Sequence, residues 1–127
     1  MRLLLTSAGI KNERIKQALL ELLGKPIEEC TALCIPTAIY ALPGGTNYAW
    51  NFFNGDFSTP MCELGWKSVG VLELSTLPSL DEAVWRPAFD EADVLLVNGG
   101  DPLFLHYWMK QSGVAQLLPD WNGVYVA

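Results

Sequence analysis

The chain has 127 residues, of which 50% are apolar and 17% charged, a composition that predicts one folded domain and excludes intrinsic disorder. Fourteen acidic against eight basic residues give a formal net charge of −6, and no Lys/Arg cluster is present, so nucleic acid is not an expected partner. No apolar run approaches the roughly 18 residues of a membrane span. The polar segment Lys11-Asn12-Glu13-Arg14 ends the first apolar stretch too early for a signal peptide. We therefore expect a soluble, cytoplasmic domain that does not bind membranes.

Strand and helix patterns alternate along the first half of the chain. Residues 2–7 predict a strand, and their apolar run without alternation indicates cover on both faces. A helix follows, with Asn12 as N-cap and an apolar stripe that ends at Gly24. Residues 31–35 predict the second strand, whereas residues 47–53 are compatible with a helix or an aromatic loop.

The second half continues the alternation. Ser58 marks the start of a short helix to about Leu64, and Ser79 is a candidate cap for a helix that Pro87 shortens or kinks. A further helix is predicted over residues 102–112, closed by Gly113. Apolar runs predict three more strands, at residues 68–74, 94–98 and 124–127.

This order of elements predicts a parallel sheet with right-handed crossovers and helices on both faces. The length is too short for a (β/α)₈ barrel, which needs about 250 residues. We expect residues 1–127 to form a single domain, a three-layer α/β/α sandwich with a mainly parallel sheet of flavodoxin-like or Rossmann-like type. No helix follows strand 124–127 to cover one of its faces, so we expect this domain to be incomplete at the C-terminus. The remainder of a larger domain, or a second chain, would complete it.

The cysteines Cys30, Cys34 and Cys62 are odd in number. Cys30 and Cys34 flank or lie in one strand, where a rise of about 3.3 Å per residue holds their Cα atoms roughly 13 Å apart. A disulfide needs less than about 7 Å. One histidine and no Cys-x-x-Cys pair give little support for a metal site. We expect buried, reduced thiols and no metal or cofactor.

The strongest candidate for chemistry is the pair Gly99 and Gly100, where strand 94–98 leads into helix 102–112. Two glycines let the backbone bend and bring N–H groups near a ligand, and the following helix N-terminus favours an anion or a developing oxyanion. The carboxyl ends of parallel strands are where open α/β sheets bind ligands. Ser7, with Gly9, follows the first strand at the same edge. Both segments are also compatible with plain tight turns.

Two other features have less specific interpretations. His106 is the only histidine and lies in an apolar helix, so we expect a hydrogen-bonded packing residue rather than a catalytic base, and no complete Ser-His-Asp triad within these residues. An aromatic group fits either a substrate wall or partner surface, or core and loop packing. Its members are Tyr48, Trp50, Phe52, Phe53 and Phe57.

Three segments together resemble the dipeptidase E (peptidase E) family: residues 4–9, residues 35–38 and residues 97–105. The resemblance continues through residues 112–113 and 117–119 into strand 124–127. It implies the class I glutamine-amidotransferase-like superfold. It also implies the activity of a serine peptidase that hydrolyses short peptides, Asp-Xaa dipeptides among them. It also implies that Gly99 and Gly100 supply the oxyanion-side backbone. The nucleophilic serine would lie just beyond Ala127, with its histidine and acid later, so this chain alone is expected to be inactive.

Where the family commonly has Gly-Gly-Asn-Thr, this chain has Gly99-Gly100-Asp101-Pro102, which places a negative charge beside the proposed oxyanion site. Ser7 and Asp101 are the candidate substrate-binding residues. The expected partners are a small peptide substrate, the C-terminal remainder or a second chain, and a further copy in a homo-oligomer. The alternative function is a non-catalytic α/β module that binds a small anionic ligand or a partner.

Overall fold

A computed structural model describes residues 1–55 and 60–127. Its centre is a five-stranded sheet in the order β1-β5-β4-β2-β3, in which every pairing is parallel. The strands are β1 (Arg2–Leu4), β2 (Thr31–Ile35), β3 (Ser68–Val71), β4 (Val94–Val97) and β5 (Val124–Val126). Because all strands run the same way, their carboxyl ends lie at one edge of the sheet.

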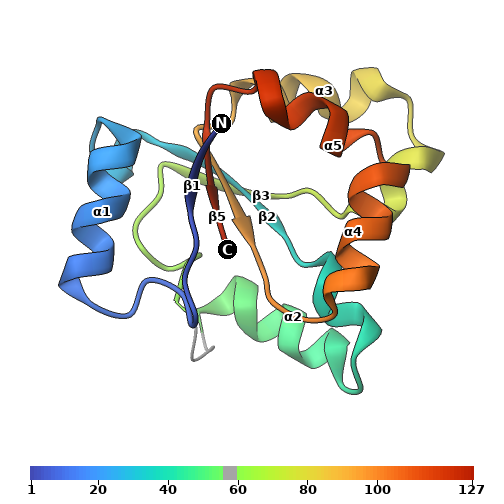
Figure 1. Ribbon diagram of the computed structural model, residues 1–127, viewed down its shortest axis with the longest axis horizontal. Coiled ribbons are helices and arrows are strands. Elements are labelled where there is room, and N and C mark those ends of the chain that lie inside the picture. Colours follow the sequence, from blue (N-terminus) through green and yellow to red (C-terminus); the bar gives the residue numbers. More distant parts are fainter. Residues whose placement is uncertain (56–59) are drawn as a thin grey trace.

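Helices cover both faces of this sheet. They are α1 (Glu13–Leu23), α2 (Gly45–Asn54), α3 (Glu82–Glu91), α4 (Pro102–Gln111) and α5 (Val114–Leu117). Short 3₁₀ segments join them: η1 (Ile27–Glu29), η2 (Thr37–Ala41), η3 (Leu74–Ser79) and η4 (Leu118–Asp120). Figure 1 shows α1 on one side of the central strands and α3, α4 and α5 on the other. The predicted three-layer α/β/α sandwich is confirmed.

The apolar run of β4 explains the two helical layers. Val94 and Leu96 belong to one buried cluster with Leu19 of α1, whereas Leu95 and Val97 belong to a second cluster with Phe89 of α3. All four β4 side chains are at most 2% exposed. Successive strand residues point to opposite faces, so an uninterrupted apolar run requires cover on both sides.

Helices α1 and α4 begin and end close to the residues that the sequence predicts. The Asn12 side chain accepts a hydrogen bond from the Ile15 amide at 2.9 Å, and Gly24 ends α1 in the left-handed conformation. Residues 102–111 form α4, and Gly113 follows it with φ of 85°. Residues 47–53, left open by the sequence, lie in α2.

The aromatic group of α2 divides between the two interpretations. Phe52 is buried in the first core cluster and Phe53 is half-buried against it, while Tyr48 and Trp50 are exposed. Phe57 lies outside the described residues, as does Ser58, where a helix start was predicted. Residues 61–64 form turns rather than helix.

Other element boundaries differ from the sequence-based prediction. Asp81 rather than Ser79 caps α3, because the Asp81 carboxylate accepts from the Ala83 amide at 3.1 Å. Strand β3 ends at Val71, since the chain turns into η3 from Leu74.

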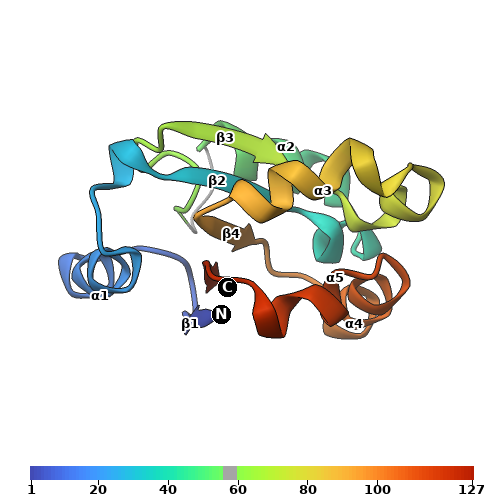
Figure 2. The ribbon, with the colours of Figure 1, turned by 90° about the horizontal axis from the view of Figure 1, so that it is seen from above.

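Strand β1 also departs from the sequence-based prediction. It occupies one edge of the sheet beside β5, and Leu3 and Leu5 are 52% and 69% exposed, so the expected cover on both faces is wrong. Figure 2 shows β1 at this edge of the sheet.

The expectation that one face of β5 is left uncovered is also wrong. Strand β5 lies between β1 and β4; Val124 and Val126 are fully buried, and Tyr125 packs against the second cluster. Helical segments that precede β5 provide the cover that a following helix was expected to give: Val114 of α5 and Trp121 belong to the second cluster. None of the described helices has the length and apolar character needed to cross a bilayer.

The three cysteines are buried free thiols, as predicted. The sequence did not indicate that Cys34 of β2 and Cys62 lie together, with 3.1 Å between their sulfur atoms. This hydrogen bond and burial both raise the pKa of the Cys62 thiol. The pair therefore behaves as a small apolar contact between the sheet and residues 61–66.

Candidate functional site

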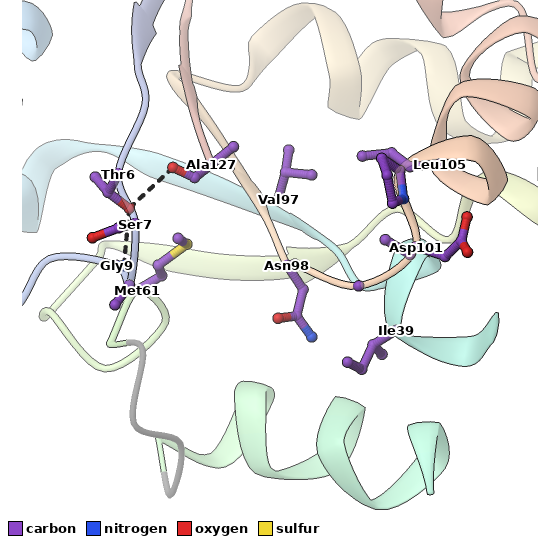
Figure 3. A pocket seen from close by; sticks show the side chains of 15 residues that line it. Thr6, Ser7, Gly9, Ile39, Met61, Val97, Asn98, Asp101, Leu105 and Ala127 are labelled. Atoms are coloured by element: carbon purple, nitrogen blue, oxygen red, sulfur yellow. Dashed lines mark hydrogen bonds between the residues drawn. The ribbon is translucent and has the colours of Figure 1, made fainter. Parts of the chain in front are cut away.

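The carboxyl ends of β1, β4 and β5 meet at a pocket of about 290 Å³. This volume is near the lower end of the range of about 300–1,000 Å³ for small-molecule sites. The pocket is lined by residues 6–9, 38–39, 97–102 and by Met61, Leu105 and Ala127. Figure 3 shows Ala127, Thr6 and Ser7 on one side and Asp101 with Leu105 on the other. All four candidate residues, Ser7, Gly99, Gly100 and Asp101, line it.

The glycine pair forms a tight connection from β4 to α4. Gly100 has φ of 153°, a conformation that favours glycine. A Cβ built there would lie 2.3 Å from the carbonyl carbon and oxygen of Ala38, whereas one built on Gly99 would meet nothing within 4 Å. Gly100 is therefore required by close backbone packing against η2, and Gly99 is not.

The amides on either side of this contact differ in their hydrogen bonds. Asp101 N–H donates to the Ala38 carbonyl at 3.0 Å, but the amides of Gly99 and Gly100 donate to no residue within the described ranges. Within these ranges both glycine amides therefore lack a protein acceptor. This is the feature that an oxyanion site requires.

Asp101 has a structural role as well as its place at the pocket. Its carboxylate accepts from the Phe104 amide at 2.8 Å and caps α4, with Pro102 in the first turn. Of the described residues that line the pocket, the half-buried Asp101 alone has a charged side chain. A negative charge beside the glycine amides opposes the binding of a free anion.

Thr6 fixes the opposite wall, a role that the sequence did not indicate. Its amide and hydroxyl both donate to the Ala127 carbonyl, at 2.6 and 3.0 Å, and its hydroxyl accepts from the Gly9 amide at 2.9 Å. These bonds extend the β1–β5 pairing beyond Leu4 and hold the turn that carries Ser7. Ser7 itself is exposed at the rim.

Segment η2, which contributes Ala38 and Ile39 to the pocket, is held by a polar network around the buried Thr37. The fully buried Thr37 hydroxyl donates to the Glu73 carboxylate and accepts from the Leu74 amide. Ser75 donates to the same carboxylate at 2.8 Å. The residues after β2 and β3 are therefore joined, which keeps η2 in place under the glycine turn.

Asn98 is the second pocket residue that sequence reasoning missed. It is only 3% exposed, and its amide nitrogen donates to no residue in the described part of the chain. Leaving a buried N–H donor without an acceptor costs about 1–3 kcal/mol. The alternation of side chains along the strand could have indicated this burial. Asn98 follows Val97 and lies on the same face as Val94 and Leu96, which belong to the first core cluster.

His106 does not belong to this site. It is exposed on α4 and does not line the pocket, so the expectation of a hydrogen-bonded packing residue is wrong. Only one side of α4 meets the core, where Met109 is buried, while Leu103 and Tyr107 are exposed with His106. No cluster of metal-ligating side chains occurs among residues 1–55 and 60–127.

A larger hollow of about 480 Å³ lies between the end of α1 and residues 24–28, before β2 begins. It is therefore at the amino edge of the sheet, away from the strand ends where α/β folds bind ligands. The pocket at the glycine turn remains the candidate site.

No protein-family model matches the chain, and no curated protein matches it. Among solved structures, it is similar to a "Putative Peptidase E Protein from Listeria monocytogenes EGD-e", with a TM-score of 0.64 and 20% sequence identity. The likeness shows the fold. It covers 98% of this chain and 56% of that one, so this chain spans just over half the length of its structural neighbour.

Proposed function

We propose that the chain is the N-terminal portion of a peptidase E-like serine peptidase that hydrolyses short peptides. The resemblance of residues 97–105 to that family supports this function, as does the shared fold. The observation that carries it is the meeting of three strand ends at one pocket: Ala127 lies there with Gly99 and Gly100, whose amides donate to no acceptor among the described residues.

In this proposal a serine just beyond Ala127 enters the pocket from the end of β5. Its Oγ attacks the peptide carbonyl carbon while a later histidine accepts the hydroxyl proton. The C–N bond then breaks, the histidine returns the proton to the leaving amine, and water hydrolyses the acyl-enzyme. The amides of Gly99 and Gly100 stabilise the oxyanion, and one such donor contributes about 100- to 1,000-fold to turnover.

The test uses the complete gene product. We expect an intact mass well above the 14.0 kDa of residues 1–127, hydrolysis of Asp-Xaa dipeptides, and labelling by a fluorophosphonate at a serine immediately after Ala127. Hydrolysis without labelling there would place the nucleophile elsewhere. Absence of both, with binding of a small anion such as phosphate, would instead favour the non-catalytic module.

Residues 1–127 alone provide the matched control for this test. Because the proposed nucleophile and base lie outside them, the isolated segment should show no hydrolysis above background. Activity of this segment would contradict the placement of the serine.

A further inference from the structure

Asn98 is fixed in place by its backbone. Its N–H donates to the Ile35 carbonyl at 3.0 Å, which continues the pairing of β4 with β2 by one residue. Strand alternation then directs the side chain to the face of the sheet covered by α1 and α2. Figure 3 shows it extending from the end of β4 into the space between Met61 and Ile39.

The surroundings of this side chain are mostly apolar. Met61 and Ile39 are 4% and 7% exposed, and Leu105 is half-buried. Asn98 is 3% exposed, and within the described residues its buried Nδ2 has no acceptor. A buried donor among apolar walls fixes the orientation of a ligand strongly, because an unmatched ligand leaves it unsatisfied.

The charge at the site decides the chemistry of the acceptor. Among the described residues, no Lys, Arg or His lines the pocket, and the only charged lining side chain is the carboxylate of Asp101. A carboxylate or phosphate bound at Asn98 would lose hydration without a countercharge and would face Asp101. A neutral carbonyl oxygen needs one N–H donor and tolerates apolar neighbours.

We propose that Asn98 is a specificity-determining residue whose Nδ2 donates a hydrogen bond to a neutral amide carbonyl oxygen of a bound peptide. The proposal rests on the proposed function in taking the ligand to be a peptide. It deepens that function, because it places a backbone carbonyl at Asn98 and excludes an acidic side chain from this subsite.

The experiment measures binding to the complete gene product with two probes. Alanyl-leucine amide carries carbonyls and no carboxylate, whereas inorganic phosphate carries charge and no carbonyl. We expect the dipeptide amide to bind more tightly than phosphate. Asn98→Leu, of similar size, should weaken the dipeptide amide about 3- to 10-fold, as expected for one neutral hydrogen bond. Asn47→Leu, an exposed asparagine of α2 away from the pocket, should not change it.

A measurement on the unmutated protein keeps the test decisive if Asn98→Leu fails to fold. The side-chain NH₂ resonances of Asn98 should shift when alanyl-leucine amide is added and should not shift with phosphate. Unchanged resonances, or equal binding by Asn98→Leu and the unmutated protein, would overturn the proposal.

Separate measurements of binding and of hydrolysis distinguish the Asn98 subsite from the proposed peptidase function. Binding through Asn98 without peptide hydrolysis would refute the peptidase and leave the Asn98 subsite standing. Hydrolysis with KM and kcat both unchanged in Asn98→Leu would refute the Asn98 subsite and leave the peptidase standing. If Asn98 acts as proposed, the loss should appear in KM, because the hydrogen bond is made to bound substrate as well as in the transition state.

Discussion

Replacing Gly100 by alanine should destabilise the fold, whereas the same change at its neighbour Gly99 should not. A Cβ at Gly100 would lie 2.3 Å from the Ala38 carbonyl carbon and oxygen and 2.6 Å from the Ile39 nitrogen. These are backbone atoms, so no side-chain rotation relieves the overlap. The φ of 153° at Gly100 adds strain for any residue with a Cβ.

Backbone strain and overpacking together set the expected loss in the free energy of unfolding. Backbone strain in a sparsely populated conformation costs about 1–3 kcal/mol, and overpacking that forces a backbone shift costs a similar amount. Together they predict a loss of about 2–6 kcal/mol in the free energy of unfolding. At roughly 4 °C per kcal/mol for a domain of this size, the midpoint should fall by roughly 8–24 °C.

Thermal unfolding followed by circular dichroism measures both variants against the unmutated protein. Gly99→Ala is the matched control, since no atom lies within 4 Å of its Cβ position. The exchange rate of the Asp101 amide, which donates to Ala38, reports whether the contact between the turn and η2 has opened. A midpoint for Gly100→Ala within about 2 °C of the unmutated protein would refute the packing argument.

Two further predictions concern stability. Phe89→Ala truncates a side chain that is 1% exposed in the second core cluster, and it should lower the free energy of unfolding by about 3–5 kcal/mol. Val84→Ala, on the same helix at a side chain that is 67% exposed, is the control and should change it by less than about 0.5 kcal/mol. Urea unfolding measures both. The pKa of Asp93 is lowered: burial opposes this, but hydrogen bonds from the Thr31 amide and from Lys25 outweigh burial. A carboxyl with a lowered folded pKa stabilises the protein above its unfolded pKa of about 4, and this contribution disappears as pH falls through the folded value. Asp93→Asn should therefore flatten the fall in unfolding free energy between about pH 5 and 3; equal slopes would exclude this role.

The sequence predicts the central strands better than the edge strands. Strand 31–35 has the predicted bounds, because its apolar residues are buried on both faces and Pro36 follows it. Residues 2–7 carry the same kind of run, yet β1 is an edge strand with Leu3 and Leu5 exposed. Apolar composition indicates a strand but does not state which neighbours it has.

The same limit applies to α4 and its histidine. Composition suggests a helix buried all round, but only the side with Met109 meets the core, and His106 lies on the other. Which face is covered depends on η2, η3 and α5, whose positions follow from tertiary packing. The glycine pair was found because its signal is local: a strand end, two glycines and a helix start are adjacent in the chain.

Asn98 shows why the remaining part of the site escaped this kind of reasoning. Its polarity suggests a turn beside two glycines, and its burial arises only when Met61 and η2, both distant in sequence, close over the end of β4. An apolar residue in this register would avoid the cost of about 1–3 kcal/mol that a buried donor without an acceptor carries. A stability cost at the carboxyl edge of a parallel sheet is expected where the compensating interaction comes from a ligand. Asn98→Leu should then be at least as stable as the unmutated protein while binding the dipeptide amide less tightly, and that opposition separates a ligand-binding residue from a packing residue.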